Sequence, residues 1–290
     1  MNVIWSSHVQ GIRTLYDSRK LRFDDRFAEQ YKALFQLDGN VSLKLLEIGC
    51  GPGALAEVLH HWYPKTRITA LDRDSAFVQF AKSKEHGVTF LEGDATALPF
   101  GNNSFDVTVS NTVSEHVEPS KFFGEQLRVL KPGGVCLVLS SRKGIHIPAK
   151  CLADSEYEQA FWEKVARFDD SMEKYGVCKY PMSEAQLPEA MERYGFHDVQ
   201  TGYVTVDLTP DDPKVSPHMA LAMIEAQRSN DLDALASVKN TIPEQVTDAE
   251  LAQMRRLINA KYDLRLAQYA RGEKQWDTSV SVIMAVRGKK

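Results

Sequence analysis

The sequence lacks both a long apolar run and an excess of basic charge. Its 290 residues are 43% hydrophobic and 26% charged, yet no uncharged apolar run approaches the roughly eighteen residues of a membrane span. The N-terminus also lacks the basic segment and following apolar segment of a targeting signal. The formal net charge of −4 gives no broad positive field for nucleic acid or an anionic membrane. We therefore expect a cytoplasmic protein that acts on small molecules, with neither nucleic acid nor a membrane as its partner.

Cysteine is scarce, and its spacing excludes the common metal motifs. The four cysteines have no C-x-x-C pair and no neighbouring histidine pattern: Cys50, Cys136, Cys151 and Cys178. Reduced structural thiols are the expectation for such a chain. His60 and His61 are adjacent on a predicted helix, where neighbouring side chains point in different directions and make poor metal ligands. The sequence thus predicts no metal site.

Internal repeats and low-complexity segments are lacking too, and what is present instead is alternation. Strand-like runs alternate with helix-like stretches over the first half of the chain, which predicts right-handed crossovers and a parallel sheet covered on both faces. Two further strands are predicted after residue 195. The seven runs are "VSLKLLEIG", "RITALD", "GVTFLEG", "FDVTVSN", "GGVCLVLSS", "FHDVQTGYVTVDL" and "WDTSVSVIMAVRG".

The length favours one domain, residues 1–290, that contains insertions. Its predicted parts are an N-terminal helical segment (1–40), a ligand-binding core (41–140), a lid insertion (141–182), a helical lid insertion (210–272) and a final strand (273–290). The aromatic and methionine side chains of the two insertions could form apolar walls around a substrate or could only be core.

Several polar residues mark the starts of helices. Ser183 with Gln186, and Thr247 with Glu250, have the spacing of capping boxes. Asp74 is predicted to cap the helix that follows it. In the second insertion, a stripe of apolar residues at helical spacing follows the capping box: Leu251, Met254, Ile258, Tyr262, Leu266 and Tyr269.

The stretch "LLEIGCGPGALAEVL", residues 45–59, predicts a strand that enters a glycine turn and continues as a helix. A turn without Cβ atoms lets a ligand approach the backbone closely. Gly49, Gly51 and Ala54 also satisfy the GxGxxA form of the dinucleotide fingerprint. Two alternatives therefore remain at this point, a dinucleotide site and a tight turn without a ligand.

Further motifs follow in a specific order: "ITALDRD", "FLEGDATALPFGNNSFDVTVSN" and "RVLKPGGVCLVLS". Together with the glycine turn they resemble the class I S-adenosylmethionine-dependent methyltransferases, in particular the branch of the type 11 methyltransferase domain that includes quinone-biosynthesis enzymes. The resemblance implies an α/β fold with a Rossmann-like seven-stranded sheet, mostly parallel with the last strand antiparallel, helices on both faces and helical lid insertions. It also implies S-adenosyl-L-methionine as cofactor and in-line methyl transfer to an oxygen, nitrogen or carbon atom of a small acceptor.

The resemblance assigns roles to the residues of the glycine turn. Gly49, Gly51 and Gly53 would let the methionine half of the cofactor approach the loop. Glu47, two residues before the first glycine, would order the loop or contact the amino group indirectly.

Other cofactor contacts are implied at the ends of the following strands. Asp72 would accept hydrogen bonds from the ribose hydroxyls, with Arg73 beside it; the alternative for Asp72 is a solvated strand-end aspartate. Asp94 and the Ala95 backbone would meet the adenine edge, unless Asp94 only forms a turn. Asn111 would line the cofactor near its reactive end.

Two residues are candidates for the acceptor side. His116, in "NTVSEHVEP", could act as a general base, or it could pack at the helix entry or touch only the cofactor. Tyr16, in the N-terminal segment, could reach the site as a tyrosine does in related enzymes, or could simply pack.

Two other functions stay open from the sequence. A dinucleotide-dependent oxidoreductase is disfavoured because it leaves "GDATALPF" and "LKPGG" unexplained. The other open function is that of a protein that binds S-adenosylmethionine without catalysis, such as a partner subunit.

Overall fold

The computed structural model describes residues 5–168 and 177–290, so residues 1–4 and residues 169–176 of the predicted 141–182 insertion lie outside the described residues. The chain forms two compact units, and each unit collects segments that are distant in sequence. We call them the helical unit (Met1–Leu21, Gly144–Tyr175, Asp207–Ser281) and the sheet unit (Arg22–Lys143, Gly176–Val206, Val282–Lys290).

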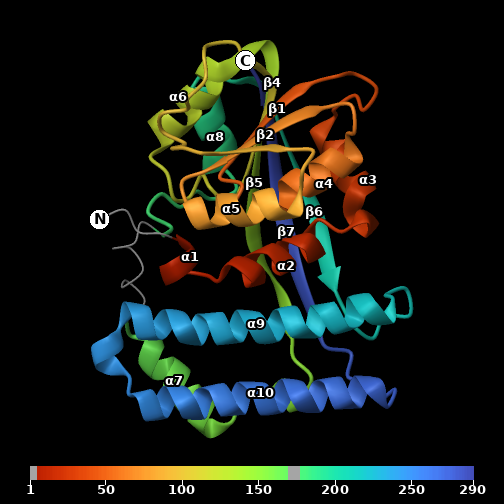
Figure 1. The fold of residues 1–290 in the computed structure, drawn as a ribbon, viewed down its shortest axis with the longest axis vertical. Coiled ribbons are helices and arrows are strands. Elements are labelled where there is room, and N and C mark those ends of the chain that lie inside the picture. Colours follow the sequence, from red (N-terminus) through yellow and green to blue (C-terminus); the bar gives the residue numbers. More distant parts are fainter. Residues whose placement is uncertain (1–4, 169–176) are drawn as a thin grey trace. The chain divides into compact units, whose positions relative to one another are not determined.

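Seven strands form one sheet within the described residues, in the order β3-β2-β1-β4-β5-β7-β6 (Figure 1). β1 pairs in parallel with both β2 and β4, and β4 pairs in parallel with β5. The predicted mostly parallel sheet with an antiparallel final strand is confirmed. The strands are β1 (Lys44–Ile48), β2 (Arg67–Asp72), β3 (Thr89–Glu92), β4 (Phe105–Asn111), β5 (Leu130–Ile147), β6 (His197–Leu208) and β7 (Thr278–Lys289).

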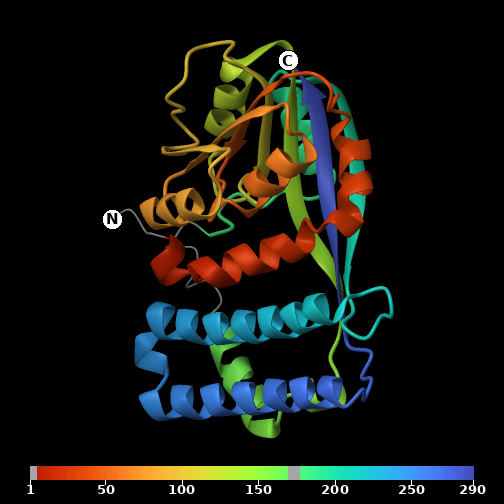
Figure 2. The same cartoon turned by 45° about the vertical axis from the view of Figure 1, so that its right-hand side comes forward.

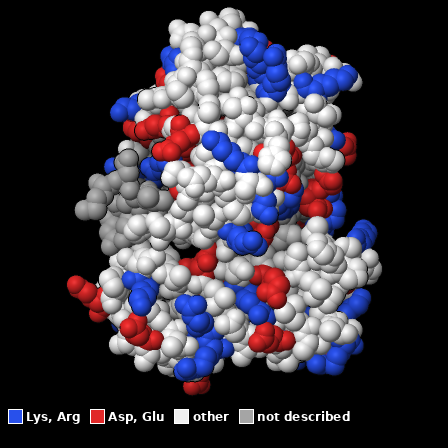
Figure 3. Space-filling view, viewed as in Figure 1, with Lys and Arg blue, Asp and Glu red and all other residues white. Residues whose placement is uncertain are grey.

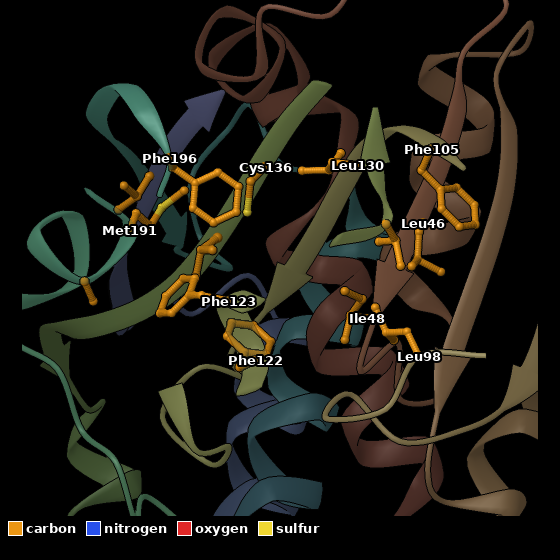
Figure 4. Close-up of a cluster of buried hydrophobic side chains, with 14 of the residues drawn as sticks. Leu46, Ile48, Leu98, Phe105, Phe122, Phe123, Leu130, Cys136, Met191 and Phe196 are labelled. Carbon is orange, nitrogen blue, oxygen red and sulfur yellow. The ribbon is translucent and has the colours of Figure 1, made fainter. Parts of the chain in front are cut away.

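Helices cover both faces of this sheet in the sheet unit. α6 and α8 lie on one side and α3 and α4 on the other (Figures 1 and 2). Figure 4 shows the core on the α6 side, where Ile48 of β1, Phe123 of α6 and Met191 of α8 belong to one buried cluster. The elements are η1 (Asp25–Phe27), α3 (Ala28–Phe35), α4 (Ala54–Trp62), α5 (Ser75–Lys84), α6 (Pro119–Val129) and α8 (Gln186–Arg193).

Two long helices, α9 and α10, run side by side in the helical unit (Figure 2). Their shared core includes Ile224 and Ile258 and receives Phe161 and Trp162 from α7, so these two aromatic side chains are core residues. None of the described helices is long and apolar enough to cross a membrane. The elements are α1 (Trp5–His8), α2 (Ile12–Arg22), η2 (Lys150–Leu152), α7 (Glu156–Ala166), α9 (Pro217–Thr241), η4 (Pro243–Gln245) and α10 (Asp248–Ala270).

The helix caps predicted at Asp74 and Thr247 are confirmed. The residues predicted as the third cap pair with each other just before α8, whose N-cap position is Ala185. Thr247 and Glu250 form a reciprocal capping box at the start of α10. Asp74 caps α5 by accepting a hydrogen bond from the Ala76 N–H at 3.0 Å. The side chains of Ser183 and Gln186 each accept a hydrogen bond from the other residue's backbone N–H before α8. Each cap satisfies N–H groups that a helix start leaves unpaired.

Candidate active site

The candidate site lies where the winding of the sheet reverses. β1 is flanked by β2 on one side and by β4 on the other, so the crossovers after β1 and after β4 lead in opposite directions along the sheet. In open α/β sheets, ligands bind in the crevice beyond the carboxyl ends of the strands at such a switch point. The predicted cofactor residues lie at or next to the carboxyl ends of β1, β2, β3 and β4.

The loop between β1 and α4 requires glycine. Gly49, Gly51 and Gly53 have φ angles of +69°, +53° and +88°, a region that residues with a Cβ rarely adopt. A Cβ atom at Gly49 would also overlap the side chain of Val113. The backbone conformation of this loop therefore cannot be kept with larger residues at these positions.

Glu47 lies beneath this loop as a buried acid. Its side chain is on β1, the residue is 1% exposed, and Oε2 has no hydrogen-bond partner among the described residues. Burial, and secondly the charge of Asp72, raise the pKa of Glu47 well above its usual range. The same burial, with the charges of Glu47 and Asp72, raises the pKa of the Cys50 thiol. A buried carboxyl in this position favours a cationic partner.

Asp72, at the end of β2, fastens the glycine loop. One carboxylate oxygen accepts the Gly51 N–H at 2.8 Å and the other accepts the Asp74 N–H at 2.9 Å. Burial raises the pKa of Asp72, and these two hydrogen bonds oppose the shift. Each carboxylate oxygen can accept a second hydrogen bond. The ribose contact of Asp72 stays a prediction. Arg73 is exposed, and its positive charge also favours ionised Asp72.

The loop after β3 carries the residues predicted to meet adenine. Asp94 is exposed, and its Oδ1 accepts hydrogen bonds from the Thr96 N–H and hydroxyl, both at 2.8 Å. Asp94 thus forms a turn, the alternative considered from the sequence. Ala95 is half-buried and packs against the sheet-unit core. The adenine contact of this loop stays a prediction, and the turn fixes the backbone that would make it.

The end of β4 carries two buried oxygen atoms. Oδ1 of Asn111 and Oγ of Ser110 have no hydrogen-bond partner within the described part of the chain. Asn111 was predicted to line the cofactor, whereas Ser110 was missed because a serine inside an apolar strand has no distinctive sequence signal. Buried polar atoms without partners are rare in folded proteins and indicate a position for a ligand or water.

His116 lies in the loop between β4 and α6. Its Nδ1 accepts a hydrogen bond from the Cys178 N–H at 2.9 Å. A backbone N–H can only donate, so the neutral imidazole carries its proton on Nε2. A general base needs an available lone pair, and in this tautomer the lone pair of Nδ1 is already used.

Tyr16 is half-buried on α2 and belongs to the helical unit. The predicted cofactor residues and His116 belong to the sheet unit. The contribution of Tyr16 to the site stays a prediction.

Comparison with known proteins connects this geometry to a family. Residues 46–138 match the family described as "Methyltransferase domain". Residues 46–138 form a methyltransferase domain. The match contains the predicted cofactor residues and His116, and it excludes Tyr16.

Relatives of the methyltransferase domain cover the chain only in part. The chain is 36% identical over 163 residues to a fatty-acid O-methyltransferase of Mycolicibacterium smegmatis, covering 52% of this chain and 59% of that protein. It is 38% identical over 96 residues to a demethylmenaquinone methyltransferase of Renibacterium salmoninarum, covering 33% of this chain and 40% of that protein. The chain therefore spans less than two thirds of the length of these curated relatives.

A solved structure shows the same fold. The phosphoethanolamine N-methyltransferase 2 of Haemonchus contortus, in complex with S-adenosyl-L-methionine, superimposes with a TM-score of 0.52 at 17% identity, covering 97% of this chain and 59% of that one. At this identity, the likeness supports the Rossmann-like architecture around the methyltransferase domain and nothing finer.

Proposed function

We propose that this protein transfers a methyl group from S-adenosyl-L-methionine to an oxygen, nitrogen or carbon atom of a small, partly apolar acceptor. The observation that carries the proposal is the grouping of acidic and amide oxygens around a glycine loop at the switch point of the sheet. Two of these oxygens, in Glu47 and Asn111, are buried without partners among the described residues.

The residues fit the chemistry of this cofactor. Its methionine half carries an ammonium and a sulfonium, and its ribose carries two hydroxyl donors. The buried Glu47 carboxyl would pair with the positive charge of the methionine half. The remaining lone pairs of Asp72 would accept hydrogen bonds from the ribose hydroxyls. The unpaired Oδ1 of Asn111 can face the reactive end.

The cofactor supplies a methyl group that is already activated by its sulfonium, so the protein mainly positions the reactants and excludes water. The glycine loop gives the backbone close access, and Asp72 holds that loop through Gly51. The Glu47 carboxyl would face the positive charge of the cofactor, and Asp72 would hold its ribose. Because that charge is dispersed as the nucleophile approaches, a dry acceptor pocket would favour the reaction.

Calorimetric titration of the purified protein tests the cofactor assignment. We expect micromolar binding of both S-adenosylmethionine and S-adenosylhomocysteine, and no binding of NADH at the same concentrations. Tight NADH binding without S-adenosylmethionine binding would support the oxidoreductase alternative instead.

Methyl transfer is then tested with a labelled methyl group and a panel of acceptors. The named activities of the two relatives suggest fatty acids of graded length and reduced quinones as members of the panel, together with a metabolite extract. Labelled product supports catalysis. Cofactor binding without labelled product from any acceptor would favour the non-catalytic alternative.

Substituting Glu47 with glutamine should abolish proton release on cofactor binding. The raised pKa of Glu47 means that the free protein holds a proton to higher pH, and a bound cation favours the carboxylate. Binding to the wild type should therefore release protons, and it should tighten as pH rises toward the raised pKa of Glu47 in the free protein. Titration in buffers of different ionisation enthalpy measures the release.

Glu47→Gln should also weaken binding by about 10- to 100-fold, the 1.5–3 kcal/mol typical of a charged hydrogen bond. Glu189→Gln, an exposed substitution on α8, is the matched control and should change neither quantity. Equal proton release in wild type and Glu47→Gln would assign the proton to another group.

We infer further that the acceptor is not a nucleic acid and that the protein works in the cytoplasm. Lysine and arginine side chains are interspersed with acidic ones on the face drawn in Figure 3, and the net charge is negative. All four cysteines are free thiols, which suits a reducing compartment. Cell fractionation and a nucleic-acid binding assay test the two statements.

A further inference from the structure

A stretch that we call the return segment, residues 177–184, leads from the insertion back into α8. Two backbone N–H groups of the return segment donate hydrogen bonds to the loop after β4. The Cys178 N–H donates to His116 Nδ1 at 2.9 Å, and the Tyr180 N–H donates to the Glu115 carbonyl at 2.8 Å. All these residues belong to the sheet unit.

Arg142 of β5 makes a third contact with the return segment. Its Nη1 donates to the Met182 carbonyl at 2.8 Å, and its Nε lies 3.5 Å from a carboxylate oxygen of Glu184. The Arg142 side chain is only 17% exposed and also contacts the Met284 sulfur. Asn111 at the end of β4 is paired with Leu139 of β5, so Arg142 lies just beyond the end of β4.

One residue of the return segment, Cys178, has a strained backbone conformation. Cys178 has a φ of +50°, in the left-handed region that residues with a Cβ rarely adopt. Such strained conformations persist only where surrounding contacts fix them. The His116 bond is made by Cys178 itself, so it acts on the strained residue directly.

We propose that the return segment is a fixed wall on the acceptor side of the site, and that His116 and Arg142 are positioning residues that hold it there. This inference rests on the proposed function, because it makes the end of β4 the place of methyl transfer. His116 acts through its Nδ1 as an acceptor for the Cys178 N–H. Its role is to fix the shape of the acceptor site, and methyl transfer needs no proton removal by its ring.

Two substitutions separate positioning from base catalysis. In His116→Asn, Oδ1 occupies the place of Nδ1, two bonds from Cβ, so the acceptor is kept and the titrating ring is lost. In His116→Phe the ring is kept and the acceptor is lost. His197→Asn, an exposed substitution at the start of β6, is the control for changing a histidine.

Hydrogen exchange and kinetics give independent readouts. In His116→Phe, we expect the Cys178 amide to exchange about 5- to 10-fold faster, which corresponds to one lost hydrogen bond of about 1 kcal/mol. The acceptor KM should rise about 3- to 10-fold, with cofactor affinity within twofold of wild type. His116→Asn should retain both amide protection and kcat, and the Tyr180 amide serves as an internal reference.

The opposite pattern overturns the proposal. A kcat at least 100-fold lower in both variants, with amide protection retained in His116→Asn, would make His116 a base. Unchanged Cys178 protection in His116→Phe would remove its positioning role, whether or not the protein is an enzyme. Absence of methyl transfer by the wild type would count against the proposed function alone, because the exchange measurement needs no turnover.

Discussion

Replacing Asp72 with alanine is expected to lower the affinity for S-adenosylmethionine by about 30- to 1,000-fold. Two ribose hydroxyls donating to a carboxylate account for about 2–4 kcal/mol in total. The substitution also removes the acceptors of the Gly51 and Asp74 N–H groups, so the loop loses its anchor. Calorimetry measures the affinity, and thermal unfolding of the free protein measures the separate effect on stability.

A ligand that lacks one ribose hydroxyl separates these two effects. If Asp72 binds the ribose, 2′-deoxy-S-adenosylhomocysteine should bind the wild type more weakly than S-adenosylhomocysteine, and Asp72→Ala should reduce that difference in a thermodynamic cycle. Asp198→Ala, at an exposed ion pair with Lys289, is the matched control. An unchanged difference between the two ligands in Asp72→Ala would restrict Asp72 to anchoring the loop.

The features of the site that follow from local sequence were predictable. A strand, a glycine turn and a helix are specified by neighbouring residues, so the positive φ angles at Gly49, Gly51 and Gly53 follow from the motif. The cap made by Asp74 and the capping box of Thr247 and Glu250 depend on residues only a few positions apart. Patterns of this length leave a clear signal in the sequence.

Contacts between distant segments left no such signal. His116 and Cys178 are 62 residues apart, and no periodicity or motif relates them. The hydrogen bond that the Cys178 N–H donates to His116 could therefore not be predicted from the sequence. The burial of Ser110 and the contact of Gly49 with Val113 likewise depend on how the strand ends come together.

The division into two units could not be predicted from the sequence, for the same reason. The sequence predicted residues 1–40 as one segment, but residues up to Leu21 group with the insertions and residues from Arg22 with the sheet. The Gly11 N–H donates to Asp233 of α9 at 2.7 Å, 222 residues away. Such a hydrogen bond between distant segments can be recognised only in the folded chain.

Replacing Arg265 of α10 with alanine is expected to destabilise the helical unit by about 3–5 kcal/mol, the usual cost of removing one partner from a buried ion pair. Arg265 is 0% exposed and lies 2.7 Å from an Asp277 carboxylate oxygen and 2.9 Å from one of Asp211. Burial lowers the pKa of Arg265, but hydrogen bonds and charges from the two aspartates outweigh it and raise that pKa. Hydrogen exchange of residues 207–281 measures the loss.

The expected loss of stability in Arg265→Ala comes from the two aspartates that Arg265 neutralises. Asp211 also accepts the Gln275 and Trp276 N–H groups at 2.7 and 2.9 Å, so without Arg265 it keeps partners but loses its counter-charge, as does Asp277. Combining Arg265→Met with Asp211→Asn and Asp277→Asn should therefore recover part of the stability, since uncharged side chains need no counter-charge. Arg271→Ala, at an exposed pair with Glu273, should cost less than about 1 kcal/mol. Equal losses in Arg265→Met and the triple variant would assign the cost to packing, because the charges would then contribute nothing.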